Sequence, residues 1–353
     1  MRILITGGCG FVGSNLAILF KEKYPDYKII CFDNLNRRGS ELNLKRLLDK
    51  GIEFAHGDIR QKDDLKRIGG ADLIIEAAAE PSVLAGSGGD LEYLIDTNLN
   101  GTINALYVAK EWKANFVFLS TSRIYPYDQI EKINYSKAPN RFELSDEQVL
   151  QGISTKGISE SFPLEGVRSM YGATKLSSEY IIQEFCKSFG LNAVINRCGV
   201  LTGPYQMGKI DQGVVVLWMA RHFWKGKLGY IGFGGEGLQV RDMLHVKDLF
   251  DLLDIQINNI STYKGEIFNV GGGREISVSL KELTTICETI TGNSINIFKE
   301  KEDRPADIPV YLTDNTKVST ITGWSPSIGV HEIMEGIFEW IKNNEIDLKP
   351  ILS

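Results

Sequence analysis

The chemistry of this sequence centres on a phenol and an ammonium group in one predicted helix. The segment SMYGATKLSSEYIIQEFCKSFG has a helical pattern that closes at Gly190, and it places Tyr171 and Lys175 four residues apart on one face. A phenol with a pKa of about 10 is a weak base at neutral pH, but a neighbouring ammonium favours the phenolate. Tyr171 is therefore a candidate base that takes an alcohol proton while the carbon loses a hydride. The same spacing occurs in ordinary amphipathic helices, so this interpretation needs a second signal.

The second signal is an apolar run that ends in hydroxyl side chains, within FLSTSRIYP at 118–126. The run NFVFLST predicts a strand that is buried on both faces, and the carboxyl ends of such strands hold the ligand in α/β proteins. Successive side chains of a strand face opposite ways, so Thr121 and Ser122 are alternatives for the hydroxyl that meets Tyr171. Together with the glycine loop described next, the hydroxyl-rich strand end favours catalysis over an ordinary helix face.

A glycine-rich loop near the start of the chain predicts a dinucleotide site. Gly7, Gly10 and Gly13 follow the apolar run RILI and precede a helical pattern. Glycines at this spacing permit a tight turn, bring backbone N–H groups to a pyrophosphate and allow close packing of helix on strand. Asp33 ends the next apolar run, where a carboxylate accepts hydrogen bonds from a ribose diol and repels a 2′-phosphate. These features predict NAD as the cofactor.

Two arginines leave NADP as an alternative. Arg37 and Arg38 lie just beyond Asp33, where a guanidinium can bind a 2′-phosphate, contact a diphosphate or remain solvated. Asp33 disfavours the first of these, and NAD stays the prediction. The segment GDIR adds Asp58 after the following strand, where it suits the adenine edge.

The scaffold for these residues is predicted from short apolar runs that alternate with amphipathic stretches. The runs are continuously apolar, which indicates a parallel sheet covered by helices, and the βαβα order predicts a doubly wound α/β Rossmann fold. Weak periodicity at 126–168 predicts a long connection. We expect a NAD-binding domain over 1–195 with roughly 238–275, and a smaller substrate-binding region over roughly 196–237 and 276–353.

Composition restricts the partners. The 353 residues carry a net charge of −6, which gives no electrostatic case for nucleic acid or an anionic membrane. The five cysteines are scattered and the four histidines form no HxxxH pair, so we expect reduced thiols and no metal site. The start MRILIT has no signal-peptide pattern, and no apolar run is long enough to span a membrane. A cytoplasmic protein is the resulting expectation.

Taken together, TGGCGFVGS, Asp33, GDIR, the hydroxyls of the strand end and YGATK resemble the extended short-chain dehydrogenase/reductase (NAD-dependent epimerase/dehydratase) family. The resemblance covers nearly the whole chain and implies a nucleotide-sugar as substrate. It implies a catalytic triad in which Thr121, placed by the pattern hydroxyl-x-x-[IV]-Y, joins Tyr171 and Lys175. It also implies Asn98 beside the cofactor, with a helix cap as the alternative role.

The substrate diphosphate is assigned by the same resemblance. QVRDMLHVKDL and EDRPADI offer Arg241 and Arg304, and two guanidiniums that converge on a diphosphate would explain anion binding by an acidic protein. An ion pair with a nearby carboxylate is the alternative for either arginine. The predicted substrate contacts are Thr121, Ser122, Arg123, Gln212, Arg241 and Arg304. The predicted cofactor contacts are Gly7, Gly10, Phe11, Val12, Gly13, Asp33, Asn34, Arg38, Asp58, Ile59, Ala77, Ala78, Asn98, Ser120, Tyr171 and Lys175.

The residues after Thr121 bear on the reaction. The family's sugar 4,6-dehydratases carry an Asp-Glu pair directly after this threonine, whereas Ser122 and Arg123 stand here and neither is a carboxylic acid. The resemblance therefore implies redox epimerisation, in which a keto-sugar forms and the hydride returns to its other face. A dehydratase and a non-catalytic NAD-binding protein are the less favoured alternatives.

The sugar is suggested by a closer resemblance. FDNLNRRGSELNL, AHGDIR, DQGVV, GLQVRDMLH and FNVGGG look most like the CDP-paratose 2-epimerase (CDP-tyvelose epimerase) branch, which implies oxidation at C2, a homodimer or homotetramer and a role in O-antigen synthesis. A UDP-sugar 4-epimerase is the alternative. Glu76 and Glu80 bracket three alanines where an HLAA-like segment is common in the family, and we assign no role to either.

Overall fold

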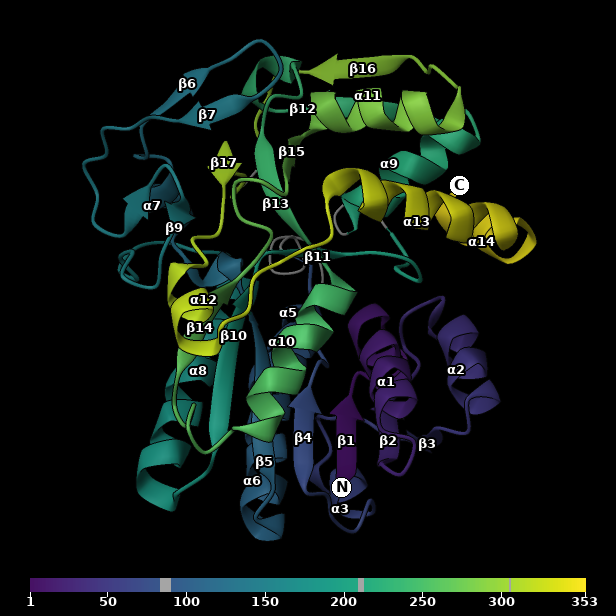
Figure 1. Ribbon diagram of the computed structural model, residues 1–353, viewed down its shortest axis with the longest axis vertical. Coiled ribbons are helices and arrows are strands. Elements are labelled where there is room, and N and C mark those ends of the chain that lie inside the picture. Colours follow the sequence, from purple (N-terminus) through teal and green to yellow (C-terminus); the bar gives the residue numbers. More distant parts are fainter. Residues whose placement is uncertain (83–89, 209–212, 305) are drawn as a thin grey trace. The chain divides into compact units, whose positions relative to one another are not determined.

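The computed structural model describes residues 1–82, 90–208, 213–304 and 306–353 (Figure 1). The chain divides into two compact units. Unit 1 consists of Met1–Ile124, Ser169–Cys198 and Leu249–Phe268. Unit 2 consists of three further segments, Tyr125–Arg168, Gly199–Asp248 and Asn269–Ser353. Gln212, a predicted substrate contact, lies outside the described residues.

Unit 1 is built on a seven-stranded sheet with the order β14-β10-β5-β4-β1-β2-β3. From β3 to β10, neighbouring strands pair in parallel. The strands are β1 (Arg2–Thr6), β2 (Lys28–Asp33), β3 (Glu53–His56), β4 (Leu73–Glu76), β5 (Asn115–Thr121), β10 (Ala193–Cys198) and β14 (Ile267–Val270). Strand order reverses between β1 and β4, and open α/β sheets bind ligands beyond the strand ends at such a point. The predicted doubly wound parallel sheet is confirmed.

Helices cover this sheet in two groups (Figure 1). They are α1 (Phe11–Lys23), α2 (Ser40–Asp49), α3 (Lys62–Lys66), α5 (Leu91–Ile95), a π-helical turn (Asp96–Asn100), α6 (Gly101–Trp112), α8 (Met170–Phe189) and α10 (Val246–Asn258). Helix α1 packs on α2 and, through Phe20, on Phe250 of α10, with ring centroids 4.8 Å apart. Helix α6 packs on α3 and α8. Each parallel strand is therefore followed by a helix that crosses to the next strand, as the predicted βαβ order requires.

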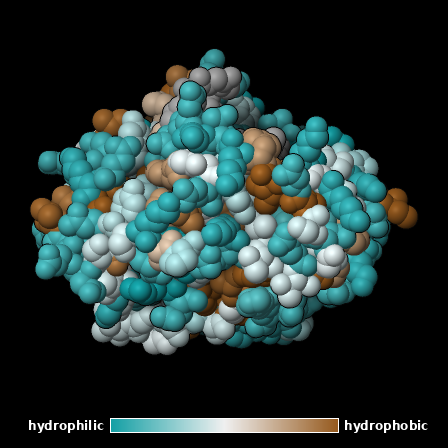
Figure 2. Space-filling model, turned by 90° about the horizontal axis from the view of Figure 1, so that it is seen from above, coloured by the Kyte–Doolittle hydropathy of each residue, from teal (hydrophilic) through white to brown (hydrophobic). Residues whose placement is uncertain are grey.

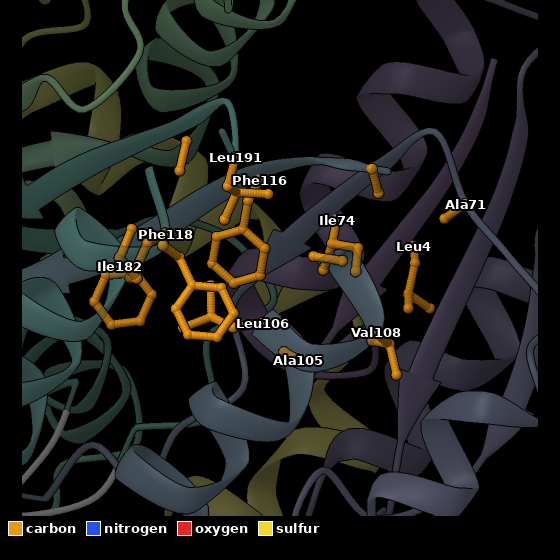
Figure 3. Close-up of a cluster of buried hydrophobic side chains, with 14 of the residues drawn as sticks. Leu4, Ala71, Ile74, Ala105, Leu106, Val108, Phe116, Phe118, Ile182 and Leu191 are labelled. Atoms are coloured by element: carbon orange, nitrogen blue, oxygen red, sulfur yellow. The ribbon is translucent and has the colours of Figure 1, made fainter. Parts of the chain in front are cut away.

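One face of the sheet forms a core with α6 and α8 (Figure 3). Leu4, Ile74, Phe116 and Phe118 extend from neighbouring strands and are fully buried. Residues two apart on a strand share a face. Glu76, two residues after Ile74 on β4, and Ser120, two residues after Phe118 on β5, therefore also face α6 and α8. Packing in this core therefore fixes the carboxyl ends of β4 and β5, where the polar residues of the sheet begin.

Helix α8 has the predicted extent, with a cap at each end. The hydroxyl of Ser169 accepts a hydrogen bond from the backbone N–H of Gly172 at 3.2 Å. Gly190 closes the helix with a φ of 74°, a left-handed conformation that glycine adopts without a steric penalty. Both caps are local, which is why the sequence pattern located the helix correctly.

Unit 2 contains a four-stranded sheet, two hairpins, a parallel strand pair and several helices. The sheet joins β11 (Val200–Thr202), β13 (Val240–His245), β15 (Ser277–Ser279) and β17 (Val310–Tyr311). The paired strands are β12 (Leu228–Ile231) with β16 (Ile297–Glu300), β6 (Tyr135–Lys137) with β7 (Phe142–Leu144), and β8 (Ile153–Ser154) with β9 (Gly157–Ile158). The helices are α7 (Tyr127–Ile130), α9 (Val214–Phe223), α11 (Leu280–Thr291), α12 (Thr316–Thr322), α13 (Val330–Asn343) and α14 (Glu345–Leu352), and a 3₁₀ turn lies at Phe233–Gly235. A 3₁₀ turn of unit 1 follows β5 at Ser122–Ile124.

The segment expected to be a long connection within the first domain is a folded part of unit 2. The hydroxyl of Tyr125 donates to Asn269 at 2.8 Å, and the Asn269 amide donates to the carbonyl of Ile158 at 2.9 Å. Ile158 N–H in turn donates to the carbonyl of Leu312 at 2.8 Å. The strands of this segment are two or three residues long, too short to show a periodicity in the sequence. These long-range bonds place the segment in unit 2.

Hydrophilic residues cover most of the face in Figure 2, and hydrophobic residues form small separate patches there. The five cysteines are buried with free thiols. In the part of the chain that the structure describes, no helix is both long and apolar enough to cross a bilayer.

The core described above leads to a stability prediction. Phe116→Ala should lower the free energy of unfolding by about 3–5 kcal/mol, because it leaves a large cavity beneath fully buried neighbours. Leu48→Ala is the matched control, since Leu48 is 55% exposed and its truncation should change stability by less than about 0.5 kcal/mol. Denaturant unfolding followed by circular dichroism measures both, and equal effects would contradict this view of the core.

Candidate active site

The glycine loop between β1 and α1 contains two glycines that the fold itself requires. Gly7 has a φ of 64°, and a Cβ there would lie 2.7 Å from the backbone of Ala78. A Cβ on Gly13 would overlap the carbonyl oxygen of Gly7. Gly10 differs, because its φ is −69° and its Cβ would lie 3.1 Å from the nearest atom. Packing alone therefore does not demand a glycine at position 10, whereas the close approach of a ligand to the backbone would.

The N-terminus of α1 is suited to an anion. Gly10 is the N-cap, no side chain caps the helix, and its first turn, which includes Phe11 and Val12, carries no acidic residue. The free N–H groups and the helix dipole of a 13-residue helix then point at the space beyond Gly10. A pyrophosphate fits this site by charge and by hydrogen-bonding capacity.

The carboxylate of Asp33 lies against the glycine loop. Its carboxylate accepts hydrogen bonds from the N–H groups of Cys9 at 3.0 Å and Leu35 at 2.8 Å. Burial raises the pKa of Asp33, and these backbone hydrogen bonds oppose the rise. The N–H of Gly10 is a third backbone donor to Asp33. A carboxylate has about four acceptor positions, so Asp33 retains capacity for a ribose hydroxyl. Arg38, predicted to contact the cofactor, lies exposed beyond this strand.

Asp58 is held by its own neighbours. Arg60 donates to both carboxylate oxygens, at 3.0 and 2.7 Å, and the amide of Asn34 donates at 3.1 Å. Burial alone would raise the pKa of Asp58, but the hydrogen bonds and charge of Arg60 outweigh it and lower the pKa to about 2. The side chain of Ile59 is buried in the core next to Gly101. Asn34, which follows β2, is thus hydrogen-bonded to the segment after β3 that holds Asp58 and Ile59. The contact of these three residues with an adenine remains a prediction.

Asn98 fixes the segment that follows β4. Its side-chain oxygen accepts from the N–H of Glu80 at 2.8 Å, and its amide donates to the Glu80 carbonyl at 3.0 Å. The residue lies inside the π-helical turn, and the N-caps of α5 and α6 are Asp90 and Asn100 instead. The alternative role of helix cap is therefore wrong. Ala77 donates its N–H to the Thr6 carbonyl at 3.2 Å, which holds the Ala77–Ala78 peptide against the glycine loop.

Thr121 and Tyr171 meet at the end of β5. A hydrogen bond with the Thr121 side chain lowers the pKa of Tyr171, as does the charge of Arg123. Burial acts more strongly in the opposite direction, with Cys198 and Glu80 adding to it, and the pKa of Tyr171 rises to about 12. Thr121 is thus the hydroxyl that faces the tyrosine, in preference to Ser122, which begins a 3₁₀ turn.

Lys175 lies one helical turn from Tyr171 and is 1% exposed. Its ammonium nitrogen is 3.9 Å from the centroid of the Phe118 ring. Burial lowers the pKa of Lys175 to about 8, while the negative charges of Glu76 and Glu179 oppose this fall. The ammonium is therefore held in the core by two carboxylates and an aromatic face.

Ser120 belongs to a buried ion-pair network. Its hydroxyl donates to Glu179 at 2.5 Å, and Glu179 accepts a bidentate bond from Arg197, with the shortest distance 2.8 Å. The two ionic side chains are 1% and 4% exposed. Sequence reasoning missed Glu179 and Arg197, although Glu179 lies four residues after Lys175 on the same helix face and so carried a signal.

The predicted substrate arginines lie in unit 2. Arg241 donates to Asp307 at 2.9 Å and to the carbonyls of Val240 and Ile308. The Asp307 N–H donates to the carbonyl of Arg304 at 3.2 Å, so the segment carrying Arg304 is tied to Arg241. The guanidinium of Arg241 thus forms an ion pair with a nearby carboxylate, the alternative to diphosphate binding that the sequence left open. Binding of a diphosphate by either arginine stays a prediction.

Comparison with known proteins agrees with this geometry. The model of the NAD dependent epimerase/dehydratase family matches residues 3–271. The chain belongs to this family. NAD is accordingly its cofactor and it is an enzyme, as the glycine loop and Asp33 predicted.

Members of the family that are named for different reactions are similar to this chain. A CDP-paratose 2-epimerase from Salmonella typhi is 31% identical, over 96% of this chain and 99% of the relative. A putative UDP-glucose 4-epimerase from Methanocaldococcus jannaschii is 28% identical, over 97% and 99% of the two chains. A dTDP-glucose 4,6-dehydratase from Streptomyces venezuelae, solved with NAD bound, superposes with a TM-score of 0.79 at 27% identity over 100% of both chains.

The contrast between Gly10 and Gly13 gives a prediction for this family member. Gly10→Ala should fold normally but bind NAD roughly tenfold or more weakly, because the added Cβ enters the space of the pyrophosphate. Gly13→Ala should instead lower the free energy of unfolding by about 1–3 kcal/mol through overpacking. Calorimetric titration with NAD and thermal unfolding separate the two effects. Gly329→Ala, with nothing within 4 Å, is the control. Unchanged NAD affinity in Gly10→Ala would contradict the assignment.

Proposed function

We propose that this protein is a nucleotide-sugar epimerase that oxidises a ring carbinol to a keto-sugar and reduces it from the opposite face. The observation that carries the proposal is that the Thr121 side chain meets Tyr171 and lowers its pKa, while Ser122 and Arg123, and no carboxylate, follow the strand end. NAD, when bound, supplies the reversible hydride acceptor and a positive charge that favours the phenolate of Tyr171.

The proton moves through residues of this chain. Tyr171 takes the proton of the reacting hydroxyl as a phenolate and returns it when the ketone is reduced, so no net proton is consumed. Thr121 holds both the phenol and the reacting oxygen. The charge of Arg123 opposes the effect of burial on the pKa of Tyr171. Lys175 adds an ammonium one helical turn away on the same face of α8. This charge is what makes a buried phenol usable as a base.

Dehydration is disfavoured by the side chains that follow Thr121. A 4,6-dehydratase must also remove a proton beside the new ketone and protonate a leaving hydroxyl, which needs an acid and a base. Ser122 has no charge to offer, and the guanidinium of Arg123 does not release its proton at accessible pH. The similarity in fold to a dehydratase therefore does not carry over to the reaction.

The proposed substrate is a CDP-sugar, with inversion at C2. The supporting observation is the 31% identity to a CDP-paratose 2-epimerase over nearly the full length of both chains. A UDP-sugar 4-epimerase is the second candidate, supported by the archaeal relative at 28% identity. In either case we assign the substrate diphosphate to Arg241 and Arg304. A cytoplasmic homo-oligomer that serves O-antigen synthesis is part of the same proposal.

A substrate panel in deuterated water tests the reaction. CDP-paratose should be converted to CDP-tyvelose with inversion at C2 and no solvent deuterium at the inverted carbon, because the hydride returns without exchange. Proton NMR of the product measures both quantities, and UDP-, GDP- and dTDP-sugars complete the panel. Inversion only at C4 of a UDP-sugar would favour the second candidate, and solvent deuterium in the product would contradict return of the hydride.

Thr121→Ala tests the catalytic threonine. Loss of its hydroxyl should reduce kcat by roughly a hundredfold, because it orients the phenol and the reacting oxygen. The enzyme should retain its NAD, measured as the nucleotide released on denaturation. Ser177→Ala, which removes an exposed hydroxyl from α8, the helix that carries Tyr171, is the control. Release of NAD from Thr121→Ala would mean that the residue binds cofactor rather than substrate.

A further inference from the structure

Glu76 is a buried carboxylate that the proposed reaction does not use. It is the last residue of β4 and is fully buried. One oxygen accepts a hydrogen bond from the hydroxyl of Thr102 on α6 at 2.5 Å, and the other has no hydrogen-bond partner among the described residues. An ionised carboxylate in such a place is costly unless a positive charge lies nearby.

Lys175 is that positive charge. In the sheet, Glu76 of β4 is the register partner of Phe118 of β5, so the two side chains lie side by side on one face. The Lys175 ammonium is 3.9 Å from the centroid of that same Phe118 ring. The electrostatic coupling is mutual, because the charge of Lys175 lowers the pKa of Glu76 and the charge of Glu76 raises the pKa of Lys175.

Glu179, the other carboxylate that acts on Lys175, is already paired with Arg197. Glu179 accepts a bidentate bond from Arg197 and a further bond from Ser120. Its negative charge is therefore largely matched by the guanidinium. Glu76 forms no ion pair with a guanidinium among the described residues, and the positive charge that acts on its pKa is Lys175. The charge balance of the buried ammonium therefore depends mainly on Glu76.

We propose that Glu76 is a positioning residue that keeps Lys175 protonated beside Tyr171 at neutral pH. The role deepens the proposed function and rests on it, since it matters only if Tyr171 acts as a base. Glu76 does not touch the reacting atoms. It acts through Lys175. Burial raises the pKa of Glu76 to about 7, and the charge of Lys175 and the hydrogen bond from Thr102 oppose that rise and favour the ionised carboxylate.

The sign of the effect follows from the groups around Lys175. Burial lowers the pKa of Lys175, whereas Glu76, Cys198 and Glu179 raise it in that order. Removing the charge of Glu76 leaves burial less opposed, so Lys175 should lose its proton at a lower pH. The ammonium would then be missing at neutral pH, and the phenolate of Tyr171 would lose its support. The high-pH limb of the rate profile should therefore move to lower pH.

Glu76→Gln tests the proposal with two independent measurements on the NAD-bound enzyme. The first is the titration of Lys175 by NMR of ¹³Cε-labelled lysine, with Lys175→Met identifying its resonance. The apparent pKa of Lys175 should fall by about one unit or more. The second is kcat against pH with the nucleotide-sugar that the wild type converts, where the high-pH limb should move by a similar amount while KM changes little.

Two further variants keep the test decisive. Thr102→Val removes the hydrogen bond that lowers the pKa of Glu76, so it should shift Lys175 in the same direction by less, and it replaces Glu76→Gln if that variant does not fold. Asp254→Asn is the control, because Asp254 is a buried carboxylate of unit 1 that pairs with Lys23 instead. It should change thermal stability without moving either pH measurement.

The outcomes separate this inference from the proposed function. An unchanged or raised pKa of Lys175 in Glu76→Gln would overturn the inference. A lowered pKa with an unmoved rate profile would also overturn it, since the charge would then be irrelevant to turnover. If the wild type converts no nucleotide-sugar, the proposed function fails and with it the catalytic role of Glu76. The lysine titration still decides whether Glu76 sets the charge of Lys175.

Discussion

A lysine ammonium buried to 1% exposure is the constraint on which the catalytic half of unit 1 depends. Such a charge is unstable in a protein interior unless other groups compensate it, and failing that the lysine loses its proton. The compensation comes from three elements. Strand β4 provides Glu76, strand β5 provides the ring of Phe118, and α8 itself provides Glu179. Register between β4 and β5, and the docking of α8 on both, must therefore be correct before the site has any chemistry.

A hydrogen-bonded network begins at Glu179, whose charge raises the pKa of Lys175. Glu179 accepts from Arg197 on β10 and from Ser120 on β5, so α8 and two strands meet in one buried polar network. Buried networks of this kind add little net stability, but they are costly when broken. The network ties α8, which carries Tyr171, to the strand that ends in Thr121.

The glycines of the loop between β1 and α1 differ in how closely the protein's own backbone approaches them. A Cβ on Gly7 or Gly13 would overlap backbone atoms of the protein, whereas a Cβ on Gly10 would meet only the carbonyl oxygen of Gly7 at 3.1 Å. Close backbone contacts at Gly7 and Gly13 therefore restrict the conformation of the loop. Asp33 adds to this preorganisation because loop N–H groups already hold its carboxylate. A site that is ordered in advance loses less conformational entropy on binding, which favours a tightly held NAD.

The sequence by itself determined the features that depend on local chemistry. Continuous apolar runs predicted the parallel sheet, Ser169 and Gly190 bounded α8, and the glycine spacing with Asp33 identified the cofactor. Each of these signals lies within a single element or within one strand–helix–strand unit. Only the tertiary structure decided which hydroxyl meets Tyr171, that 125–168 folds with unit 2, and that Arg241 pairs with Asp307. It also gave Glu76 a neighbour, because Glu76 and Lys175 are far apart in the chain and meet only when β4, β5 and α8 pack together. Burial and long-range charge set these pairings, and neither leaves a local pattern in the sequence.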